Sequence, residues 1–457
     1  MKTNTRKGLI VLLLMIVSIT HISAQVAKKI SLEEAIGLSL QHSKQLKLAE
    51  AKTIEAGAAL SESRQRRLPD VSASGAYMRV TQPNFNLKIP LSSSSSQQGS
   101  GESSGGSGVS SFPTVNEAMY GMASASLPIF SGFRINNGIQ SAKYLKKAAE
   151  LDAEHDKDEV IANTIAAYCN LYKATAALEI VNENLKQSQQ RVADLENMER
   201  NGLLARNDLL KAQLQQSNIE LAKLDAENNW KITYINMNLM LGLDEYTELE
   251  PEITGFTNYS DNNDFSFWEN AALNNRADLK AMEMRKNAAL AGVRAAKGEY
   301  YPSLALTGGY IALNVPKILT ASNIINGGIG IKYSPSSLWK TGSKVAQAKS
   351  RLEQTRITQD ILSDAARLES AQSYQQYLSS IKKIDVYKKA QEQATENYKI
   401  VKNKYDNSLA TTTELLDADV ALLQAKLNHA FAKADAFVAY NKLKQVTGTL
   451  EQATITK

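Results

Sequence analysis

Cysteine and proline are both scarce in this sequence, and each scarcity excludes something. Of the 457 residues only Cys169 is a cysteine, so the chain cannot form an intrachain disulfide and must be stabilised by packing. Nine prolines are present, but none lies between Pro128 and Pro251 and none follows Pro335. A proline inside a helix removes a hydrogen bond and clashes with the preceding turn. These two proline-free runs can therefore form helices of unusual length.

Long apolar runs and strong charge are also missing. Beyond the first two dozen residues, no stretch approaches the run of about 18 apolar residues typical of a membrane-spanning helix. The formal net charge is +5 without a block of basic residues, which excludes the charge pattern of a nucleic-acid-binding protein. His42, His155 and His429 have no neighbours at metal-ligand spacing, and no phosphate-binding or nucleophile motif occurs. We predict that the chain is not an enzyme and holds no cofactor or metal.

Residues 1–24 have the character of a secretory signal peptide. A basic start that includes Lys2 and Lys7 precedes the mostly apolar stretch 9–22, and small residues precede a predicted cleavage site before Gln25. An uncleaved anchor is the alternative. No cysteine follows the cleavage site, so we do not expect a lipoprotein.

The rest of the sequence contains the same order of elements twice. In each half a helical stretch ends at a proline, Pro69 or Pro302, and a sequence pattern typical of β-strands follows. The alternation of apolar and polar residues is clearest at 325–333. The Ser- and Gly-rich segment 92–111 is interpreted as an exposed loop between two strands, with a domain linker as the alternative. The expected boundaries are a first repeat at 25–242 with strands at about 70–88 and 117–130, a connector at 243–264, a second repeat at 265–448 with strands at about 302–315 and 324–334, and a C-terminal tail at 449–457.

A long helical hairpin completes each repeat. We expect one at 133–242 with its tip near 200–207 and one at 341–448 with its tip near 406–412. Helical arms of this length extend roughly 100 Å at about 1.5 Å per residue, too far for a compact globule. Apolar residues recur along them at steps of three and four, which is typical of helices packed side by side in coiled coils. These residues are Leu171, Ala174, Leu178, Val181, Leu185, Ser188, Val192 and Leu195; Leu210, Leu214, Ser217, Leu221 and Leu224; and Leu416, Val420, Leu423, Leu427, Ala430, Ala434 and Phe437.

The two expected tips share one short pattern, ERNGLLARNDLL at 199–210 and YDNSLATTTELL at 405–416. Gly202 is expected to adopt the left-handed conformation that ends a helix. In the second tip Asn407 or Ser408 takes that position. The candidates for capping the following helix are Asn207 or Asp208 in the first tip and Thr412 or Thr413 in the second.

Four strands are too few to close a barrel, and an open sheet edge exposes backbone groups that lipid cannot satisfy. Several copies of the chain are therefore needed: two would supply eight strands, and three would supply twelve, enough for an open lumen. The predicted fold class is mainly α with a transmembrane β-barrel portion that continues into a long helical barrel. Phe130, Phe133 and Trp339 lie where strands give way to helices, which suits either a membrane-interface role or ordinary packing.

With these features the sequence resembles the TolC family of bacterial outer-membrane efflux channels. The resemblance covers essentially the whole mature chain. It rests on the duplicated plan, on LPIFSG at 127–132, on NRADL at 275–279 (where the family usually has Pro in place of Ala277), and on both tips. It implies a homotrimer with a twelve-stranded barrel in the outer membrane of a Gram-negative bacterium and a helical barrel across the periplasm. It also implies two partners, a periplasmic adaptor (membrane fusion) protein and, through it, an inner-membrane pump.

The resemblance also assigns roles to residues at the tips. Asp208 and Tyr405 match positions that link inner and outer hairpins, while Glu414 and Asp417 match two acidic rings at the gate. Carboxylates in the first turn of a helix are also favoured by the helix dipole alone, and this alternative stays open for Asp208 and Glu414. In place of the basic residue that the family often has near the second tip, this chain has Ala410. The expected adaptor contacts are Gly202, Leu203, Leu204, Ser408, Leu409 and Ala410.

The predicted function is a passive exit duct of a tripartite efflux or type I secretion system, in which the pump selects the cargo. Two alternatives share part of the pattern. A secreted or periplasmic coiled-coil protein without a pore has the same heptads but leaves the paired strands unexplained. A periplasmic adaptor also carries a hairpin, but normally one hairpin flanked by compact β-rich domains.

Overall fold

The computed structural model describes residues 28–79, 116–252, 263–316 and 319–450. The predicted signal peptide, residues 80–88 of the first predicted strand and the Ser- and Gly-rich segment 92–111 lie outside the described residues. So do residues 253–262 of the predicted connector and residues 451–457 of the predicted C-terminal tail.

The elements occur in the duplicated order that the sequence predicts. In chain order they are β1 (Lys28–Ile30), α2 (Leu32–His42), α3 (Lys44–Gln65), β2 (Asp70–Arg79), β3 (Glu117–Phe130), α4 (Arg134–Arg200), α5 (Arg206–Leu241), β4 (Leu249–Pro251), α6 (Phe265–Asn275), α7 (Ala277–Lys297), the 3-10 helix η2 (Gly298–Tyr300), β5 (Ser303–Val315), β6 (Leu319–Lys332), α8 (Ser337–Asp406) and α9 (Thr412–Val446). Two helices, two strands and a long hairpin thus follow one another twice, which confirms the predicted plan. Strand β6 begins at Leu319, earlier than the predicted position 324.

Contacts divide the chain into two compact units that cut across the repeats. The hairpin unit comprises residues 1–55, 147–284 and 356–457, and the strand unit comprises 56–146 and 285–355. Each unit contains segments of both repeats, because equivalent parts of the two halves pack together.

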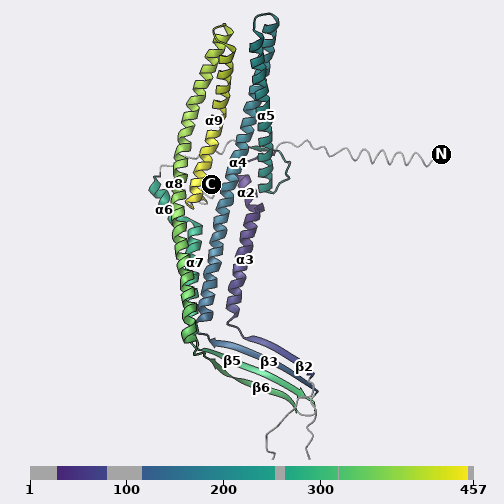
Figure 1. Ribbon diagram of the computed structural model, residues 1–457, viewed down its shortest axis with the longest axis vertical. Helices are drawn as coiled ribbons and strands as arrows, with labels where there is room; N and C mark the ends of the chain where they lie inside the picture. Colours follow the sequence, from purple (N-terminus) through teal and green to yellow (C-terminus); the bar gives the residue numbers. More distant parts are fainter. Residues whose placement is uncertain (1–27, 80–115, 253–262, 317–318, 451–457) are drawn as a thin grey trace, which may run out of the picture. The chain divides into compact units, whose positions relative to one another are not determined.

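One antiparallel sheet forms the centre of the strand unit, with the strand order β2-β3-β5-β6 (Figure 1). The register pairs Tyr77 with Met119 and Tyr310 with Ile325, and one irregularity interrupts β3 between Pro128 and Phe130. Strands β2 and β6 are the two edges of this sheet. Their outer backbone groups have no partner strand in the described chain.

The two faces of this sheet differ in chemistry. Because successive side chains of a strand point to opposite sides, the register assigns each residue to one face. One face carries the large apolar residues Val71, Tyr77, Met119, Leu127, Leu306, Tyr310, Ile325, Ile329 and Ile331. In the half of the sheet next to the helices, the opposite face carries Ser72, Ser74, Ser124, Ser126, Thr307 and Asn326, and the hydroxyl oxygens of Ser72 and Ser124 lie 2.9 Å apart. In the other half, this face carries the apolar residues Met78, Tyr120, Met122, Ile311 and Leu313.

The hairpin unit contains two helical hairpins, α4–α5 and α8–α9 (Figure 1). Helices α4 and α8 have 67 and 70 residues and begin in the strand unit. Among the described helices, none combines the length and the hydropathy needed to cross a bilayer. Along α4, the predicted apolar row is buried or half-buried, and Val181 and Leu185 pack against Ile219 of α5.

The predicted apolar row on α5 does not face α4. Leu209, Ala212 and Ile219 are the α5 residues that pack against α4 near the tip, whereas the row predicted from the heptads is exposed. At 100° per residue, the exposed large apolar residues of α5 fall within roughly a quarter of its circumference. They are Leu210, Leu214, Leu221, Leu224, Ile232 and Leu239. The sequence pattern shows that α5 has an apolar stripe but does not show what covers it.

A second exposed stripe follows α8, again within roughly 100° of arc at 100° per residue. Its residues are Ile357, Ile361, Leu368, Leu378, Val386 and Ile400. In α9 the predicted row is mixed, since Leu416, Ala434 and Phe437 are buried and Val420 is exposed.

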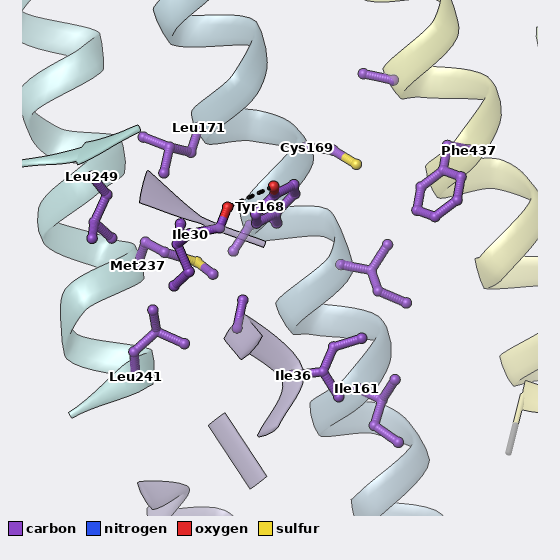
Figure 2. Packing of buried hydrophobic residues seen from close by; sticks show 14 of the residues in the cluster. Ile30, Ile36, Ile161, Tyr168, Cys169, Leu171, Met237, Leu241, Leu249 and Phe437 are labelled. Carbon is purple, nitrogen blue, oxygen red and sulfur yellow. Dashed lines mark hydrogen bonds between the residues drawn. The ribbon is translucent and has the colours of Figure 1, made fainter. Parts of the chain in front are cut away.

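The main core of the hairpin unit lies around Tyr168 of α4 (Figure 2). Its hydroxyl donates to the carbonyl of Ile30 at 2.9 Å and lies 3.0 Å from that of Glu252, so α4 is joined to the short parallel pair β1–β4. Burial raises the pKa of Tyr168 to about 12, which keeps this phenol neutral. The neighbouring Cys169 is fully buried and burial raises its pKa to about 12, so its thiol is unreactive.

Arg276, in the NRADL segment, connects four helices. Its guanidinium makes two bonds to Asp278 (3.0 and 2.8 Å) and one to Glu369 of α8 (2.8 Å), and it donates to the carbonyl of Val446 in α9 (3.3 Å). Burial opposes ionisation of Asp278, but the bonds from Arg276 outweigh it and hold the pKa of Asp278 below its usual range. These charges hold the junction between α6 and α7 against α8 and α9.

Candidate functional site

The two hairpin tips have the same backbone turn. Gly202 and Ser408 both adopt the left-handed conformation, with φ of 71° and 60°. The N–H of the next residue, Leu203 or Leu409, donates to the carbonyl five residues earlier, at 2.9 and 2.7 Å. This is the Schellman arrangement that satisfies the last carbonyls of a helix. Ser408 therefore keeps the turn shape that the sequence pattern assigns to glycine.

The first tip has no side-chain cap. Helix α5 begins at Arg206, and its N-cap residue is Ala205, which makes no side-chain capping bond. The expectation that Asn207 or Asp208 caps α5 is therefore wrong. Both residues already lie inside the helix, so the Asp208 carboxylate stands in its first turn, where the helix dipole favours it.

The second tip has a complete capping box. The Thr411 hydroxyl accepts from the N–H of Glu414 at 3.2 Å, and the Glu414 carboxylate accepts from the N–H of Thr411 at 2.7 Å. The backbone and side-chain bonds from Thr411 hold the pKa of Glu414 below its usual range. The expectation that Thr412 or Thr413 caps α9 is wrong, because the helix begins one residue after Thr411.

Asp208 lies at the tip of the first hairpin and Tyr405 at the tip of the second. Within the described residues, their side chains do not bond to each other. Asp208 pairs with Lys211 at 3.4 Å, and Lys211 donates to Thr413 of the other hairpin at 3.2 Å. Tyr405 packs against the apolar cluster at the first tip, and its oxygen accepts a long bond from Thr412, 3.5 Å. The link between hairpins at this level is therefore made by Lys211 and by the packing of Tyr405.

Glu414 and Asp417 are both exposed and lie three residues apart on α9, a spacing that places them on one side of the helix. Among the tip residues expected to contact an adaptor, Leu203 and Leu409 are 74% and 76% exposed. Leu204 differs, because it packs against the apolar cluster formed by Val192, Leu195, Leu209 and Ala212.

The strongest connection between the hairpins was not identified from the sequence. Arg191 of α4 donates to Asp419 of α9 at 2.9 Å and to the Tyr398 oxygen of α8 at 3.0 Å. The side chains of Arg191 and Asp419 are only 12% and 2% exposed. Burial disfavours the charged guanidinium, but the bond and charge of Asp419 outweigh it and raise the pKa of Arg191. The sequence holds one indication of this pair: Asp419 is an acidic residue among the buried apolar positions between Leu415 and Leu422.

Two further ion pairs join α4 to α9, with alternating sign. Lys173 pairs with Asp435 at 2.9 Å, and Glu183 pairs with Lys426 at 3.8 Å. From Lys173 through Glu183 to Arg191, the charges on α4 are positive, negative and positive. The charges that face them on α9 are negative, positive and negative. A shift of one helix along the other would place like charges together, so these pairs define the register between the hairpins.

The described residues contain no group of three or more His, Cys, Asp or Glu side chains that is placed to hold a metal ion. A polar groove of about 680 Å³ runs between α4, α8 and α9 in the hairpin unit, beside Lys173, Gln376 and Lys442. The arrangement thus offers paired exposed tips, two exposed acids near the second tip and a buried ion pair that joins the two hairpins.

A family model described as outer membrane efflux protein matches residues 35–243 and 268–449. The chain belongs to the outer membrane efflux protein family. The predicted resemblance and the predicted function, an efflux duct of the outer membrane and not an enzyme, are confirmed at the level of this family. A comparison with the curated proteins finds no match.

Solved structures of outer-membrane channels share the fold of this outer membrane efflux protein. The CmeC outer membrane channel of Campylobacter jejuni has a TM-score of 0.77 at 17% identity, over 92% of this chain and 86% of that chain. VceC of Vibrio cholerae has a TM-score of 0.74 at 18% identity, over 91% and 96%. The open state of MtrE of Neisseria gonorrhoeae has a TM-score of 0.70 at 16% identity, over 92% and 89%.

Proposed function

We propose that three copies of this chain form the exit duct of a tripartite efflux assembly. In this proposal the sheets together form a barrel in the outer membrane, and the hairpins together form a tube in the periplasm. The paired tips are the gate and the docking surface for a periplasmic adaptor, which connects the duct to an inner-membrane pump. The observation that carries the proposal is the pair of exposed apolar stripes on α5 and α8.

These stripes support a self-association surface. A helix in water buries its apolar side against a neighbour, yet α5 and α8 each keep a continuous apolar row exposed although they already pack within the chain. If α5 of one copy lies along α8 of the next, both rows are buried. Head-to-tail contacts of this kind close into a ring when the rotation between copies permits.

The sheet supports the same assembly. Its two edges, β2 and β6, are unpaired within the described chain, and pairing them between copies satisfies their backbone groups. In the half of the sheet next to the helices, an apolar face lies opposite a face of serine, threonine and asparagine, which suits a barrel wall with lipid outside and water inside. Twelve strands give a lumen rather than a filled interior.

The tips support a gate with acidic rings. In a trimer, Glu414 and Asp417 would each occur three times around the axis, and carboxylates grouped in this way favour cations. Glu414 also serves its own capping box, so the structural and gate roles coexist in one residue. Asp417 is exposed and makes no hydrogen bond or ion pair within the described residues, which leaves its charge available.

The buried ion pair supports a closed arrangement of the two hairpins. Arg191 and Asp419 lie close to the tips in sequence, and a buried pair of this kind is more valuable for specifying one arrangement than for net stability. We assign it, together with Lys211 and Tyr405, the task of keeping the α8–α9 tip against the α4–α5 tip.

Adaptor docking is assigned to the outermost turns. Leu203 and Leu409 are exposed apolar residues on equivalent turns, and each lies on a backbone that is held by the preceding helix. An exposed apolar residue on a rigid turn is a suitable anchor for a partner's groove. Export to the periplasm requires the signal peptide expected at residues 1–24, and the absence of a following cysteine favours a protein without a lipid anchor.

Ion conduction across a planar bilayer tests this proposal. The wild type should conduct with a preference for cations, and replacing Glu414 and Asp417 together with Ala should reduce that preference. Replacing the exposed Glu55 of α3 with Ala is the matched control and should leave it unchanged. An unchanged preference in the double variant would remove the acidic rings but keep the duct. A wild-type protein that inserts and never conducts would contradict the duct itself.

A further inference from the structure

The two faces of the sheet change character toward the end that is far from the helices. The face that is apolar beside the helices gains polar and charged residues there, since the register pairs Arg79 with Glu117 and Asn314 with Thr320. The Tyr77 hydroxyl on this face donates to the Glu117 carboxylate at 2.8 Å. The opposite face, which carries serine and threonine beside the helices, becomes apolar over the same rows.

This apolar part of the opposite face is continuous across the strands, and we call it the distal apolar patch. The register pairs Tyr120 of β3 with Leu313 of β5. One row along, it pairs Met122 with Ile311, and Ile311 with Ile324 of β6. Side chains of paired residues lie next to one another on one face, and none of the residues that the register places among them is charged. The patch consists of Met78, Tyr120, Met122, Ile311, Leu313 and Ile324.

The distal apolar patch is open to solvent in the single chain. Apolar surface in water is unfavourable, and a contiguous exposed patch marks a surface that contacts something else. Four of its side chains are 39% to 48% exposed, those of Met78, Tyr120, Met122 and Ile324.

The proposed barrel places this patch in the lumen. Side chains alternate between the two faces along a strand, so the patch faces the same side as the serine and threonine residues that the proposed function assigns to water. Pairing β2 of one copy with β6 of the next joins the three patches into a belt. On the lipid side, the charges of Arg79 and Glu117 mark the end of the apolar surface. The belt therefore lies at the mouth of the barrel, where a water-filled lumen is normally polar.

The chemistry of the belt suits the apolar part of a passing solute. A barrel of twelve strands leaves a lumen, so the three patches do not fill one another's space. Because the patch carries no charge, it offers no ion pair to a charged group. Met78 and Met122 have flexible, polarizable side chains that adapt to ligands of different shapes. Contacts of this kind are weak enough to let a solute leave, as conduction requires.

We propose that the distal apolar patch binds the apolar part of an amphipathic small molecule as it leaves the duct. The inference rests on the proposed function, because the patch lines a lumen only if three sheets close into a barrel with their serine-bearing faces inward. It gives the exit a preference of its own: amphipathic solutes are held at the mouth, whereas small ions and sugars pass without delay.

Single-channel recording in a planar bilayer tests the proposal, with octyl glucoside and ethyl glucoside added at the barrel mouth. Both probes are neutral and have the same sugar head, so they differ only in the apolar chain. Octyl glucoside should interrupt the current, and ethyl glucoside should not. Met122→Ser should raise the concentration of octyl glucoside needed for half block about tenfold, because each of three copies loses an apolar contact.

Met119→Ser is the matched control. It makes the same change on the same strand, and the two methionines are similarly exposed in the single chain, at 43% and 41%. Met119 lies on the opposite face of the sheet, so its replacement should leave the block by octyl glucoside unchanged. Native mass spectrometry checks that each variant is still a trimer.

Thiol labelling shows whether the patch is open in the assembled protein. The one native cysteine, Cys169, is buried and unreactive, so a thiol introduced at another position is labelled selectively. In the trimer embedded in lipid, a membrane-impermeant maleimide should modify Met122→Cys, and octyl glucoside should slow that reaction. Met119→Cys, on the lipid side, should react at least tenfold more slowly.

Several outcomes would overturn the assignment. If Met122→Cys does not react in the trimer, another copy or another segment of the chain covers the patch. If the wild type conducts but octyl glucoside does not block it, or blocks it and Met122→Ser equally, the patch holds no solute and the duct still stands. Equal weakening by Met119→Ser would mean that octyl glucoside acts through the bilayer. A wild type that never conducts would contradict the duct, and the inference would fail with it.

Discussion

The two hairpin tips adopt one backbone turn but stabilise it in different ways. The α8–α9 tip has a capping box between Thr411 and Glu414, whereas the α4–α5 tip starts its second helix from Ala205 without a side-chain cap. The left-handed residue also differs, glycine in one tip and serine in the other. The turn shape therefore follows from the backbone hydrogen bonds that end the first helix, while the cap determines how firmly the second helix begins.

A related difference separates the two arms of the first hairpin. Helix α4 buries its apolar row within the chain, and α5 exposes its predicted row and packs with another set of residues. One arm thus completes the fold of the chain, and the other presents a surface. The predictions that follow test these two contrasts, beginning with the connection that joins the hairpins.

Removing one partner of the buried ion pair should have the largest effect. Arg191→Ala leaves Asp419 buried without its partner, which costs about 3–5 kcal/mol in comparable cases. Lys173→Ala, at a more exposed pair, should cost no more than about 1 kcal/mol. Denaturant unfolding of the detergent-solubilised protein measures both. The exchanged pair Arg191→Asp with Asp419→Arg should recover part of the loss. Equal losses at the two sites would mean that burial does not distinguish them.

The two faces of α5 should respond differently to truncation. Ile219→Ala removes a side chain that is 2% exposed and packs against α4, so it should cost about 2–5 kcal/mol. Leu221→Ala removes a side chain that is 62% exposed in the single chain, so it should leave the fold of that chain intact and weaken association between copies. Circular dichroism and the particle mass at increasing dilution separate the two effects. A Leu221 variant that unfolds without dissociating would show that the stripe belongs to the core of the chain.

Exchanging the caps should reduce the difference between the tips. Thr411→Ala should destabilise the start of α9 by about 1 kcal/mol, and Ala205→Ser should stabilise α5 by a similar or smaller amount. Hydrogen exchange of the first-turn amides reports each helix start separately. If Thr411→Ala leaves exchange at α9 unchanged, the capping box has no energetic role.

A smaller effect should appear with pH at the second tip. The pKa of Glu414 is depressed by the bonds from Thr411, so its contribution is fully present above the unfolded-state pKa and is lost as pH falls through the folded value. Glu414→Gln keeps a capping side chain but removes the titration. The protection of the first-turn amides of α9, taken relative to their intrinsic exchange rate at each pH, should fall at acidic pH in the wild type and less so in this variant. The same loss of protection in both would exclude Glu414 as its source.

The fold was largely predictable because its elements are long and repeated. Proline positions and heptads predicted the hairpins. The position after Pro302 predicted β5, and the alternation at 325–333 predicted β6 except for its start. Cap positions were less accurate, because several residues near 207 and 411 are good caps and only the backbone decides where the helix begins. Strand β6 starts earlier than predicted because Leu319, Thr320 and Ala321 also pair with β5. These pairs lie beyond a register shift in β5, which the alternation of residues does not reveal.

The site was predictable only in part. The tips were found because their pattern occurs twice, but a buried pair such as Arg191 and Asp419 joins residues 228 positions apart, and one sequence does not show which distant residues meet. The direction of the α5 stripe was hidden for a different reason. Periodicity identifies an apolar face, but it does not distinguish a partner within the chain from a partner in another copy.

The central claim is that the exposed stripes and sheet edges are covered by further copies of the same chain. Native mass spectrometry of the detergent-extracted protein measures this directly. The account predicts a particle of three copies that remains trimeric on dilution and separates into monomers when Leu214 and Leu221 are replaced with Glu. A wild-type protein that stays a monomer in detergent and in lipid, with its stripes exposed, would contradict the account.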